Sequence, residues 1–285
     1  MKLRLALLLA FTAVVLRASP ELDSAVALYR EKKFPDARAA LEKIATAEPA
    51  NAAACYYLGL TLSHRGDATA LDDAVPWLQK AVDLAPNNAD YLADFGGISM
   101  QFAQKNSSLA AALKGRDAME KSLTINPDNL DTREGLFRFY DGAPWPIGSG
   151  SKAAKQLEEI RKRDADRATV LSVIGKTNAK DFPAAFKLCD EALAKNPANY
   201  VALYQYGRTA SVSGQNAERG IACLEKCLAL PLPGPASPTH SNAAYRIGTL
   251  HEHLMHPAEA RASYESALQL DPANKQAAGA LAKLK

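Results

Sequence analysis

The sequence predicts an all-α protein in which pairs of helices stack along the chain. Aromatic residues make up only 7% of the 285 residues while alanine is abundant, which favours close-packed helices over a β-sandwich. No run of useful length alternates with the period of a strand. After residue 20, one pattern of small and apolar residues recurs along the chain. With 48% hydrophobic residues, the chain also has enough apolar side chains for a core.

The recurring pattern is an alanine, an apolar residue four positions later, a small residue three after that, and a proline five further on. Its four clearest copies are Ala37, Leu41, Ile44, Pro49; Ala74, Leu78, Ala81, Pro86; Ala185, Cys189, Ala192, Pro197; and Ala260, Tyr264, Ala267, Pro272. A glycine stands ten residues after a proline at Gly59, Gly96 and Gly207, and Gly248 stands twelve before Ala260. Small residues at these positions let two antiparallel helices approach closely, and the proline starts the turn into the next pair.

This pattern resembles the tetratricopeptide repeat, a 34-residue helix-turn-helix unit, over nearly all of residues 19–285. The resemblance implies a right-handed superhelical solenoid, in which each unit buries its apolar stripe against its neighbours. It also implies an inner groove lined by the first helix of each unit.

The first three units follow the chain in order. The first unit runs through Pro49 and the second through Pro86, with three extra residues at 68–70 between its helices. The third ends at Pro127 and carries about seven inserted residues around 103–114. We therefore expect its second helix to be longer than usual.

The fourth and fifth units are irregular. The fourth begins near Leu130 and breaks at 141–151, where we expect Pro144 and Pro146 to end its first helix and Ser151 to cap its second. This break also resembles an insertion of some exported bacterial repeat proteins. The fifth has Val173 in place of the glycine, although its second helix, from 182 to 197, is regular.

The sixth unit leads into a proline-rich linker at 230–240, which cannot continue a helix. The seventh is regular from Asn242 to Pro272. Residues 273–285 then predict a closing helix whose lysines face water, as a stacked array requires.

Residues 1–18 have the layout of a secretory signal peptide. Lys2 and Arg4 precede an apolar run from Leu5 to Leu16, followed by the small residue Ala18. This run is shorter than the roughly 20 residues that cross a bilayer, so we expect cleavage after Ala18 and no membrane span in the mature chain. The predicted location is the bacterial periplasm or cell envelope, or the medium.

The formal charge of +3 comes from 34 basic and 31 acidic residues. Lys2, Arg4 and Arg17 lie in the predicted signal peptide, so the mature chain balances at 31 of each. Without a broad positive field, a nucleic-acid partner is not expected.

The sequence offers no reaction centre. Four cysteines are too few for a disulfide framework in a chain this long and are interpreted as small buried residues, with a bridge between distant cysteines left open. His251, His253 and His256 do not have the HExxH spacing and point in different directions on a helix, so no metal or cofactor is predicted. No nucleophile, base and acid can be grouped, and a hydrolase using the histidine tract is a distant alternative.

The resemblance places positions 2, 5, 9, 12 and 13 of each unit on the inner groove. Tyrosine and arginine often dominate interface energies because they combine large area with directional donors. The residues carried over are Tyr56, Tyr204 and Tyr245 at position 5; Arg138 and Arg208 at position 9; Asp90 and Asp131 at position 2; and His64 and His253 at position 13. Of these, the candidate partner-binding residues are Tyr56, His64, Arg138, Tyr204, Arg208, Tyr245 and His253.

The function predicted is that of a non-catalytic scaffold that binds a peptide segment or a protein surface in its groove. The chaperone-tail clamp of some tetratricopeptide proteins needs basic and asparagine residues, whereas the second unit has Ala53, Tyr56 and Leu60 at positions 2, 5 and 9. An assembly component of an envelope complex, binding through its outer face or the loop of Trp145, is the alternative.

Overall fold

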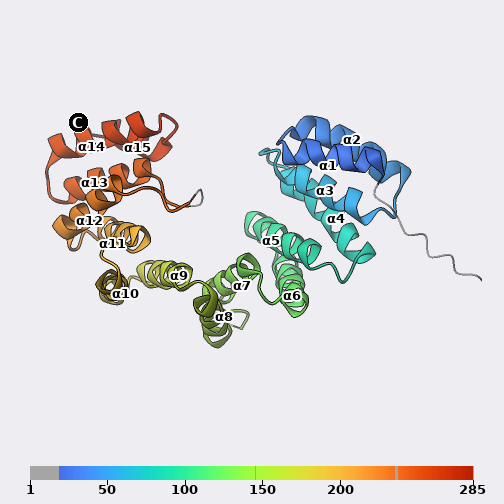
Figure 1. Cartoon of the computed structure of the whole chain (residues 1–285), viewed down its shortest axis with the longest axis horizontal. Coiled ribbons are helices and arrows are strands. Elements are labelled where there is room, and N and C mark those ends of the chain that lie inside the picture. Colours follow the sequence, from blue (N-terminus) through green and yellow to red (C-terminus); the bar gives the residue numbers. More distant parts are fainter. Residues whose placement is uncertain (1–18, 145, 235–236, 285) are drawn as a thin grey trace, which may run out of the picture. The chain divides into compact units, whose positions relative to one another are not determined.

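A computed structural model describes residues 19–144, 146–234 and 237–284 of the chain. Within these residues all the regular elements are α-helices, fifteen in number, and they form seven successive hairpins and a final helix (Figure 1). The predicted all-α class is therefore confirmed. The predicted signal peptide and Trp145 lie outside the described residues. No helix in the described ranges has both the length and the apolar character needed to cross a bilayer.

The chain forms two compact units, divided between Thr132 and Arg133. The first unit contains α1 (Pro20–Arg30), α2 (Phe34–Ala47), α3 (Ala52–Ser63), α4 (Ala70–Leu84), α5 (Ala89–Asn106), α6 (Leu109–Ile125) and the start of α7 (Leu130–Gly142). Side-chain oxygens of Ser19, Asn51, Asn88 and Ser108 accept from backbone N–H groups in the first turns of α1, α3, α5 and α6. These caps explain why the helices begin where they do.

The second unit contains the rest of α7 and eight further helices. They are α8 (Gly150–Arg163), α9 (Ala165–Asn178), α10 (Phe182–Lys195), α11 (Tyr200–Ser213), α12 (Ala217–Ala229), α13 (His240–His253), α14 (Pro257–Leu270) and α15 (Lys275–Leu281). Consecutive helices pack against each other from α1 to α6 in the first unit and from α8 to α15 in the second.

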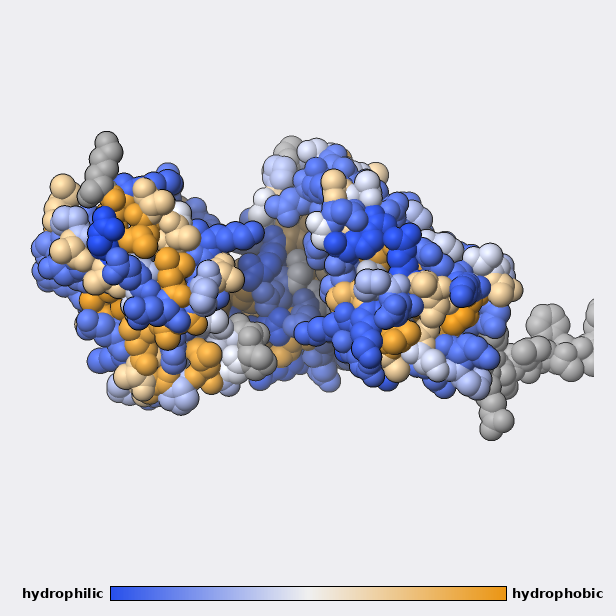
Figure 2. Space-filling view, turned by 90° about the horizontal axis from the view of Figure 1, so that it is seen from above, coloured by the Kyte–Doolittle hydropathy of each residue, from blue (hydrophilic) through white to orange (hydrophobic). Residues whose placement is uncertain are grey.

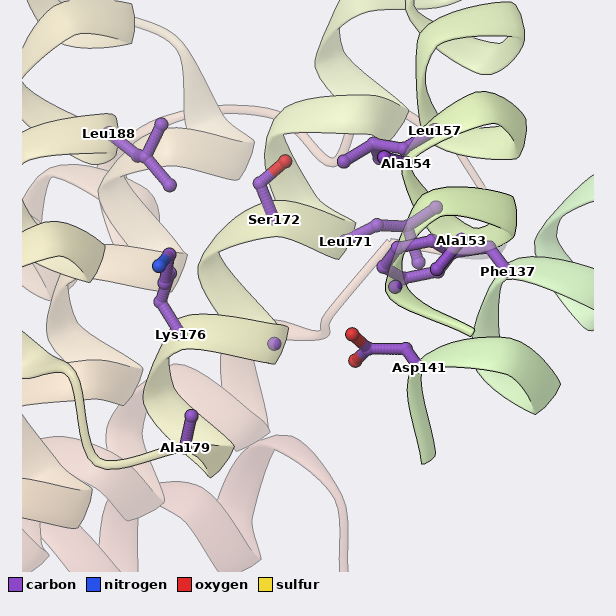
Figure 3. Close-up of a pocket in the computed structure, with 12 residues that line it drawn as sticks. Phe137, Asp141, Ala153, Ala154, Leu157, Leu171, Ser172, Lys176, Ala179 and Leu188 are labelled. Atoms are coloured by element: carbon purple, nitrogen blue, oxygen red, sulfur yellow. The ribbon is translucent and has the colours of Figure 1, made fainter. Parts of the chain in front are cut away.

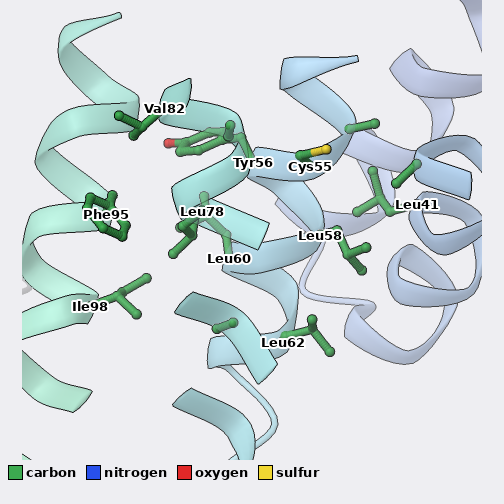
Figure 4. Packing of buried hydrophobic residues seen from close by; sticks show 14 of the residues in the cluster. Leu41, Cys55, Tyr56, Leu58, Leu60, Leu62, Leu78, Val82, Phe95 and Ile98 are labelled. Atoms are coloured by element: carbon green, nitrogen blue, oxygen red, sulfur yellow. The ribbon is translucent and has the colours of Figure 1, made fainter. Parts of the chain in front are cut away.

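The recurring glycines lie at the closest approaches within hairpins. A Cβ atom placed on Gly59 would come within 2.6 Å of Cγ of Leu78, and one placed on Gly207 within 2.3 Å of Cγ of Leu224. Leu41, Leu58 and Leu78 are fully buried in the core of the first unit (Figure 4). The small positions of the repeat thus set the distance at which the larger side chains interlock.

The insertion in the third hairpin lengthens both helices. α5 has 18 residues and α6 has 17, and the turn between them places Ser107 in the left-handed region with φ of 51°. The sequence analysis expected only the second helix to be extended.

The predicted cap of α8 was wrong by two residues. Ser149, with extended backbone, accepts from the N–H of Lys152 at 3.3 Å, whereas Ser151 already lies inside the first turn. A cap must precede the first helical residue, because its own backbone is not helical. The first helix of this hairpin, α7, ends at Gly142, just before Pro144.

Five hairpin turns place a residue other than glycine in the left-handed region, and three of these residues share one position in the turn. Lys32, Lys180 and Met255 have φ of 59°, 60° and 61° and occupy the same place between the two helices of the first, fifth and seventh hairpins. This conformation brings the Cβ atom close to the following carbonyl oxygen.

Candidate interaction surface

Three first helices of the second unit, α9, α11 and α13, lie side by side. α11 packs against α9 on one side and against α13 on the other. Arg246 of α13 bonds to Tyr204 and Ser211 of α11, which lie on either side of Arg208 in the sequence. The charges of Arg246 and of Arg138 of α7 both act on Arg208. We call these three residues the arginine cluster.

Tyr204 fixes the position of Arg246. The hydroxyl of Tyr204 accepts from Nε of Arg246 at 2.9 Å, and the guanidinium lies 5.6 Å from the centre of the tyrosine ring. Nη1 of Arg246 also donates to Oγ of Ser211 at 3.0 Å. Because Tyr204 is only 5% exposed, it offers little surface to a partner and serves instead to orient Arg246.

Arg208 lacks an acceptor. Its Nη1 is buried and has no hydrogen-bond partner in the described part of the chain. Burial and the charges of Arg246 and Arg138 lower the pKa of Arg208, while Tyr204 acts in the opposite direction. A buried donor without an acceptor is costly, and a neighbouring positive charge adds to that cost.

Arg138 differs from the other two arginines because it is exposed and paired. Its Nη2 lies 2.7 Å from Oε1 of Glu134. The second oxygen of Glu134 lies 2.7 Å from Nε of Arg167 on α9. The charge of Arg138 is therefore partly balanced within the chain.

His253 and Tyr245 have separate roles. Nε2 of His253 donates to the carbonyl of Ser211 at 3.0 Å, so this residue ties α13 to the end of α11. The ring of Tyr245 lies 5.8 Å from that of Tyr264 and packs on a cluster that includes Ala277 of the closing helix α15. The structure thus places Tyr245 against the helix that closes the array.

The two candidate residues of the first unit lie among aromatic rings. Tyr56 is 8% exposed, stacks on Tyr91 at 4.1 Å and donates from its hydroxyl to Asp94. Burial raises the pKa of Asp94, although the bond from Tyr56 opposes this shift. His64 is exposed and stacks on Phe34 at 4.6 Å.

Tyr56 and His64 are linked only indirectly. Tyr57 contacts Tyr56 edge-on at 5.0 Å and Tyr29 at 5.6 Å, and the ring of Tyr29 lies 6.0 Å from that of His64. A row of aromatic rings therefore connects the two predicted residues through the body of the first unit.

The histidine tract does not converge on one point. The rings of His251 and His256 lie 6.0 Å apart, while His253 is directed to Ser211. Among the described residues, no group of three histidine, cysteine or acidic side chains is arranged to hold a metal ion.

A separate groove of about 400 Å³ lies between α7, α8, α9 and α10. Its walls are mostly apolar, with Phe137, Ala153 and Leu171 close together and the charged groups of Asp141 and Lys176 nearby (Figure 3). None of the predicted partner-binding residues lines it. Elsewhere, hydrophobic and hydrophilic residues are interspersed on the face seen in Figure 2.

Comparison with known families decides the nature of the repeats. Models of the tetratricopeptide repeat match residues 22–89 and 241–274, which cover nearly all of helices α1 to α4 and of α13 and α14. This chain is a tetratricopeptide-repeat protein. A comparison with curated protein sequences gives no significant match.

Solved structures agree with this fold. A tetratricopeptide repeat protein from Parabacteroides merdae has a TM-score of 0.65 at 14% identity, covering 92% of this chain and 96% of that one. Yeast Tom70 has a TM-score of 0.61 at 15% identity, covering 92% of this chain and 52% of that one, so this chain spans about half of that protein. At such identities the similarity is one of fold.

The repeat numbering explains which residues the sequence analysis missed. Asp94 and Arg246 both occupy position 6 of a first helix, and each bonds the position-5 tyrosine of the preceding repeat, Tyr56 and Tyr204 respectively. In this tetratricopeptide-repeat protein, one sequence signal would have identified Asp94 and Arg246. Each is a charged residue at position 6, and the preceding repeat has a tyrosine at position 5.

Proposed function

We propose that this protein is a non-catalytic scaffold that binds a segment of another protein along the first helices of its second unit. The tetratricopeptide fold supports this proposal, because its stacked helices form long surfaces suited to protein partners. The absence of a converging set of catalytic groups in the sequence agrees with it. We further propose that it acts in a bacterial periplasm or cell envelope, since residues 1–18 have the layout of a signal peptide.

The observation that carries this proposal is the state of Arg208. Most long polar side chains around it are engaged within the chain, as are Arg138 with Glu134 and Arg246 with Tyr204. Arg208 instead keeps a buried guanidinium nitrogen without an acceptor. We infer that a partner supplies the acceptor for this donor, since arginine is enriched among the residues that dominate interface energies.

Photo-crosslinking in the producing cells tests this surface. Val212 lies one helical turn after Arg208 and is 52% exposed, so a photoreactive amino acid there reports contacts along α11. We expect it to crosslink to a partner protein, and we expect the additional change Arg208→Gln to remove that product. A crosslink that persists unchanged in the double variant would contradict a role for Arg208.

The alternative is a structural component of an envelope complex that binds through its outer face. The apolar groove between α7, α8, α9 and α10 favours this alternative. Asp141 and Gly150 line the groove, so it adjoins the break of the irregular fourth hairpin at 141–151. A photoreactive group at Ala154, which is exposed and lines the same groove, reports on this surface. Crosslinks from 154 and none from 212 would favour the alternative.

The proposed location has its own test. Fractionation of the producing cells should place the protein outside the cytoplasm, and sequencing of the mature N-terminus should begin at Ser19. A protein retained in the cytoplasm with Met1 or Lys2 at its start would refute the export.

A further inference from the structure

The first unit carries a continuous row of tyrosine rings. Tyr29 of α1, Tyr57 of α3 and Tyr91 of α5 are half-buried, so each keeps part of its surface in contact with solvent. The ring of Tyr57 lies 5.6 Å from that of Tyr29 and 5.0 Å from that of Tyr56, which in turn stacks on Tyr91. We call these four residues the tyrosine row. It extends over the first helices of three successive hairpins.

Two aspartates of α5 border the tyrosine row. Oδ2 of Asp94 accepts from the hydroxyl of Tyr56, while Oδ1 accepts from no described residue. Asp90 is exposed and precedes Asp94 by one helical turn, so both lie on the same face of α5. Burial and the charge of Asp94 raise the pKa of Tyr29. Burial, a neighbouring tyrosine and the charge of Asp90 raise the pKa of Tyr91. Both carboxylates therefore lie close to the row.

The negative charge of these carboxylates is not balanced by the described part of the chain. Neither Asp90 nor Asp94 forms an ion pair there, and burial together with the charges of Asp90 and Asp131 raises the pKa of Asp94. α3 contains no charged residue. Arg30 and Lys105 lie in the last turns of α1 and α5, and Lys105 is paired with an aspartate of α4. A cation bound beside Asp90 and Asp94 would relieve the repulsion between them.

The second unit shows how this chain holds a guanidinium group with the same kinds of residue. Arg219 lies 4.5 Å from the centre of the Tyr206 ring and pairs with Asp190. Arg246 lies 5.6 Å from the centre of the Tyr204 ring. In the first unit, by contrast, no described cation lies over a ring of the tyrosine row. The tyrosines and the aspartates are present there, and the guanidinium group is left for a partner.

We propose that the tyrosine row, with Asp90 and Asp94, binds arginine side chains of a basic peptide segment. The guanidinium plane stacks on an aromatic ring while its fork donates to a carboxylate, whereas lysine offers only a compact charge. An acidic segment would be repelled by the two carboxylates. This surface belongs to the first unit, so its test is independent of the proposed role of Arg208 in the second.

Fluorescence anisotropy with defined peptides tests the proposal on the purified full chain at neutral pH. The probes are a labelled peptide containing four arginines separated by glycine and serine, and the same peptide with lysine, glutamine or glutamate in place of arginine. We expect the arginine peptide to bind at least about ten times more tightly than the glutamine peptide, since a hydrogen bond to a charged group is strong. The lysine peptide should be intermediate. The affinity should fall as salt is added.

Three aspartate variants locate the site. Asp90→Asn and Asp94→Asn should each weaken binding of the arginine peptide about fivefold or more, because each removes one of the unbalanced charges. Asp83→Asn on α4 is the matched control. Asp83 is exposed and accepts from Gln79 on its own helix, so this variant loses the same charge and should keep the affinity within about twofold.

Two variants of one tyrosine separate the ring from its hydroxyl. Tyr57→Leu removes the aromatic face and should weaken binding of the arginine peptide about fivefold, as expected for a lost cation–π contact. Tyr57→Phe keeps the ring and should bind within about twofold of the wild type. Circular dichroism checks that each variant is folded.

Several results would overturn the arginine site. They are an equal loss with Asp83→Asn, equal binding of the glutamine peptide, tighter binding of the glutamate peptide, or lysine binding as tightly as arginine. If Tyr57→Leu does not fold, the comparison of Asp90→Asn with Asp83→Asn, both at exposed positions, decides the matter. A crosslink from 212 that depends on Arg208, together with no binding of the arginine peptide, would retain the proposed function and reject this second surface.

Discussion

The hydroxyl of Tyr56 donates a hydrogen bond to Asp94 on the first helix of the following repeat. Tyr204 makes the equivalent contact in the second compact unit of the chain, where its hydroxyl accepts a hydrogen bond from Arg246 of the following repeat. A tyrosine at position 5 thus bonds a charged residue at position 6 of the next repeat, with a negative group in the first unit and a positive group in the second. These contacts tie neighbouring hairpins together.

Asp94 should make stability fall as the pH rises. Burial raises its pKa in the folded state, so the folded protein keeps a proton that the unfolded chain has already lost. This contribution is fully present below the unfolded pKa and is lost as the pH rises through the folded pKa. We therefore expect Asp94→Asn to gain stability relative to the wild type as the pH rises from about 4 to about 7. Urea unfolding at several pH values measures this.

Asp67 provides a control, because its effect on stability should change with pH in the opposite direction. Its hydrogen bond from Arg65 at 2.7 Å holds the pKa of Asp67 well below its ordinary value. Stability from this pair is present above the unfolded pKa and is lost as the pH falls, so Asp67→Asn should lose stability relative to the wild type as the pH rises. The same slope for both variants would contradict the assignment.

Gly248→Ala should destabilise the seventh hairpin. A Cβ atom there would lie 2.5 Å from Cε1 of Tyr264, a rigid ring that is completely buried. Overpacking of this kind costs about 1–3 kcal/mol. Gly279→Ala in α15, where a new Cβ meets nothing within 4 Å, is the matched control and should be neutral or slightly stabilising. Urea midpoints that move equally would refute the close contact.

The four cysteines should be unreactive in the folded protein. All four are free and buried, and burial raises the pKa of Cys189 and of Cys227 to about 12. The thiolate is the reactive form, so a thiol reagent at about pH 8 should label the native protein slowly. In denaturant, all four should react at once. Recovery of only two thiols there would reveal a disulfide.

Two serines at the start of α8 test the corrected helix boundary. Ser149→Ala removes the side-chain acceptor for the N–H of Lys152 and should cost about 1 kcal/mol. Ser151→Ala, inside the first turn, should have little effect. Thermal unfolding of both variants compares them, and a larger loss at residue 151 would restore the original prediction.

The spacing of small residues was enough to predict the hairpins. Gly59 and Leu78, or Gly248 and Tyr264, belong to one repeat, and their contact follows from helical periodicity alone. The burial of Tyr204 could not be predicted in the same way, because it depends on Arg246, 42 residues later and on another repeat. Periodicity gives the direction of a side chain from its own helix, but not what the neighbouring helix places over it.

The turns at Lys32, Lys180 and Met255 bear on how much stability this array has in reserve. Met255 is 84% exposed, so its side chain contributes almost no packing in return for its unfavourable backbone conformation. The same conformation costs glycine nothing, yet three hairpins keep a larger residue at this point. Their tight bends are therefore held by the helices on either side, and the array is less stable than its own architecture allows.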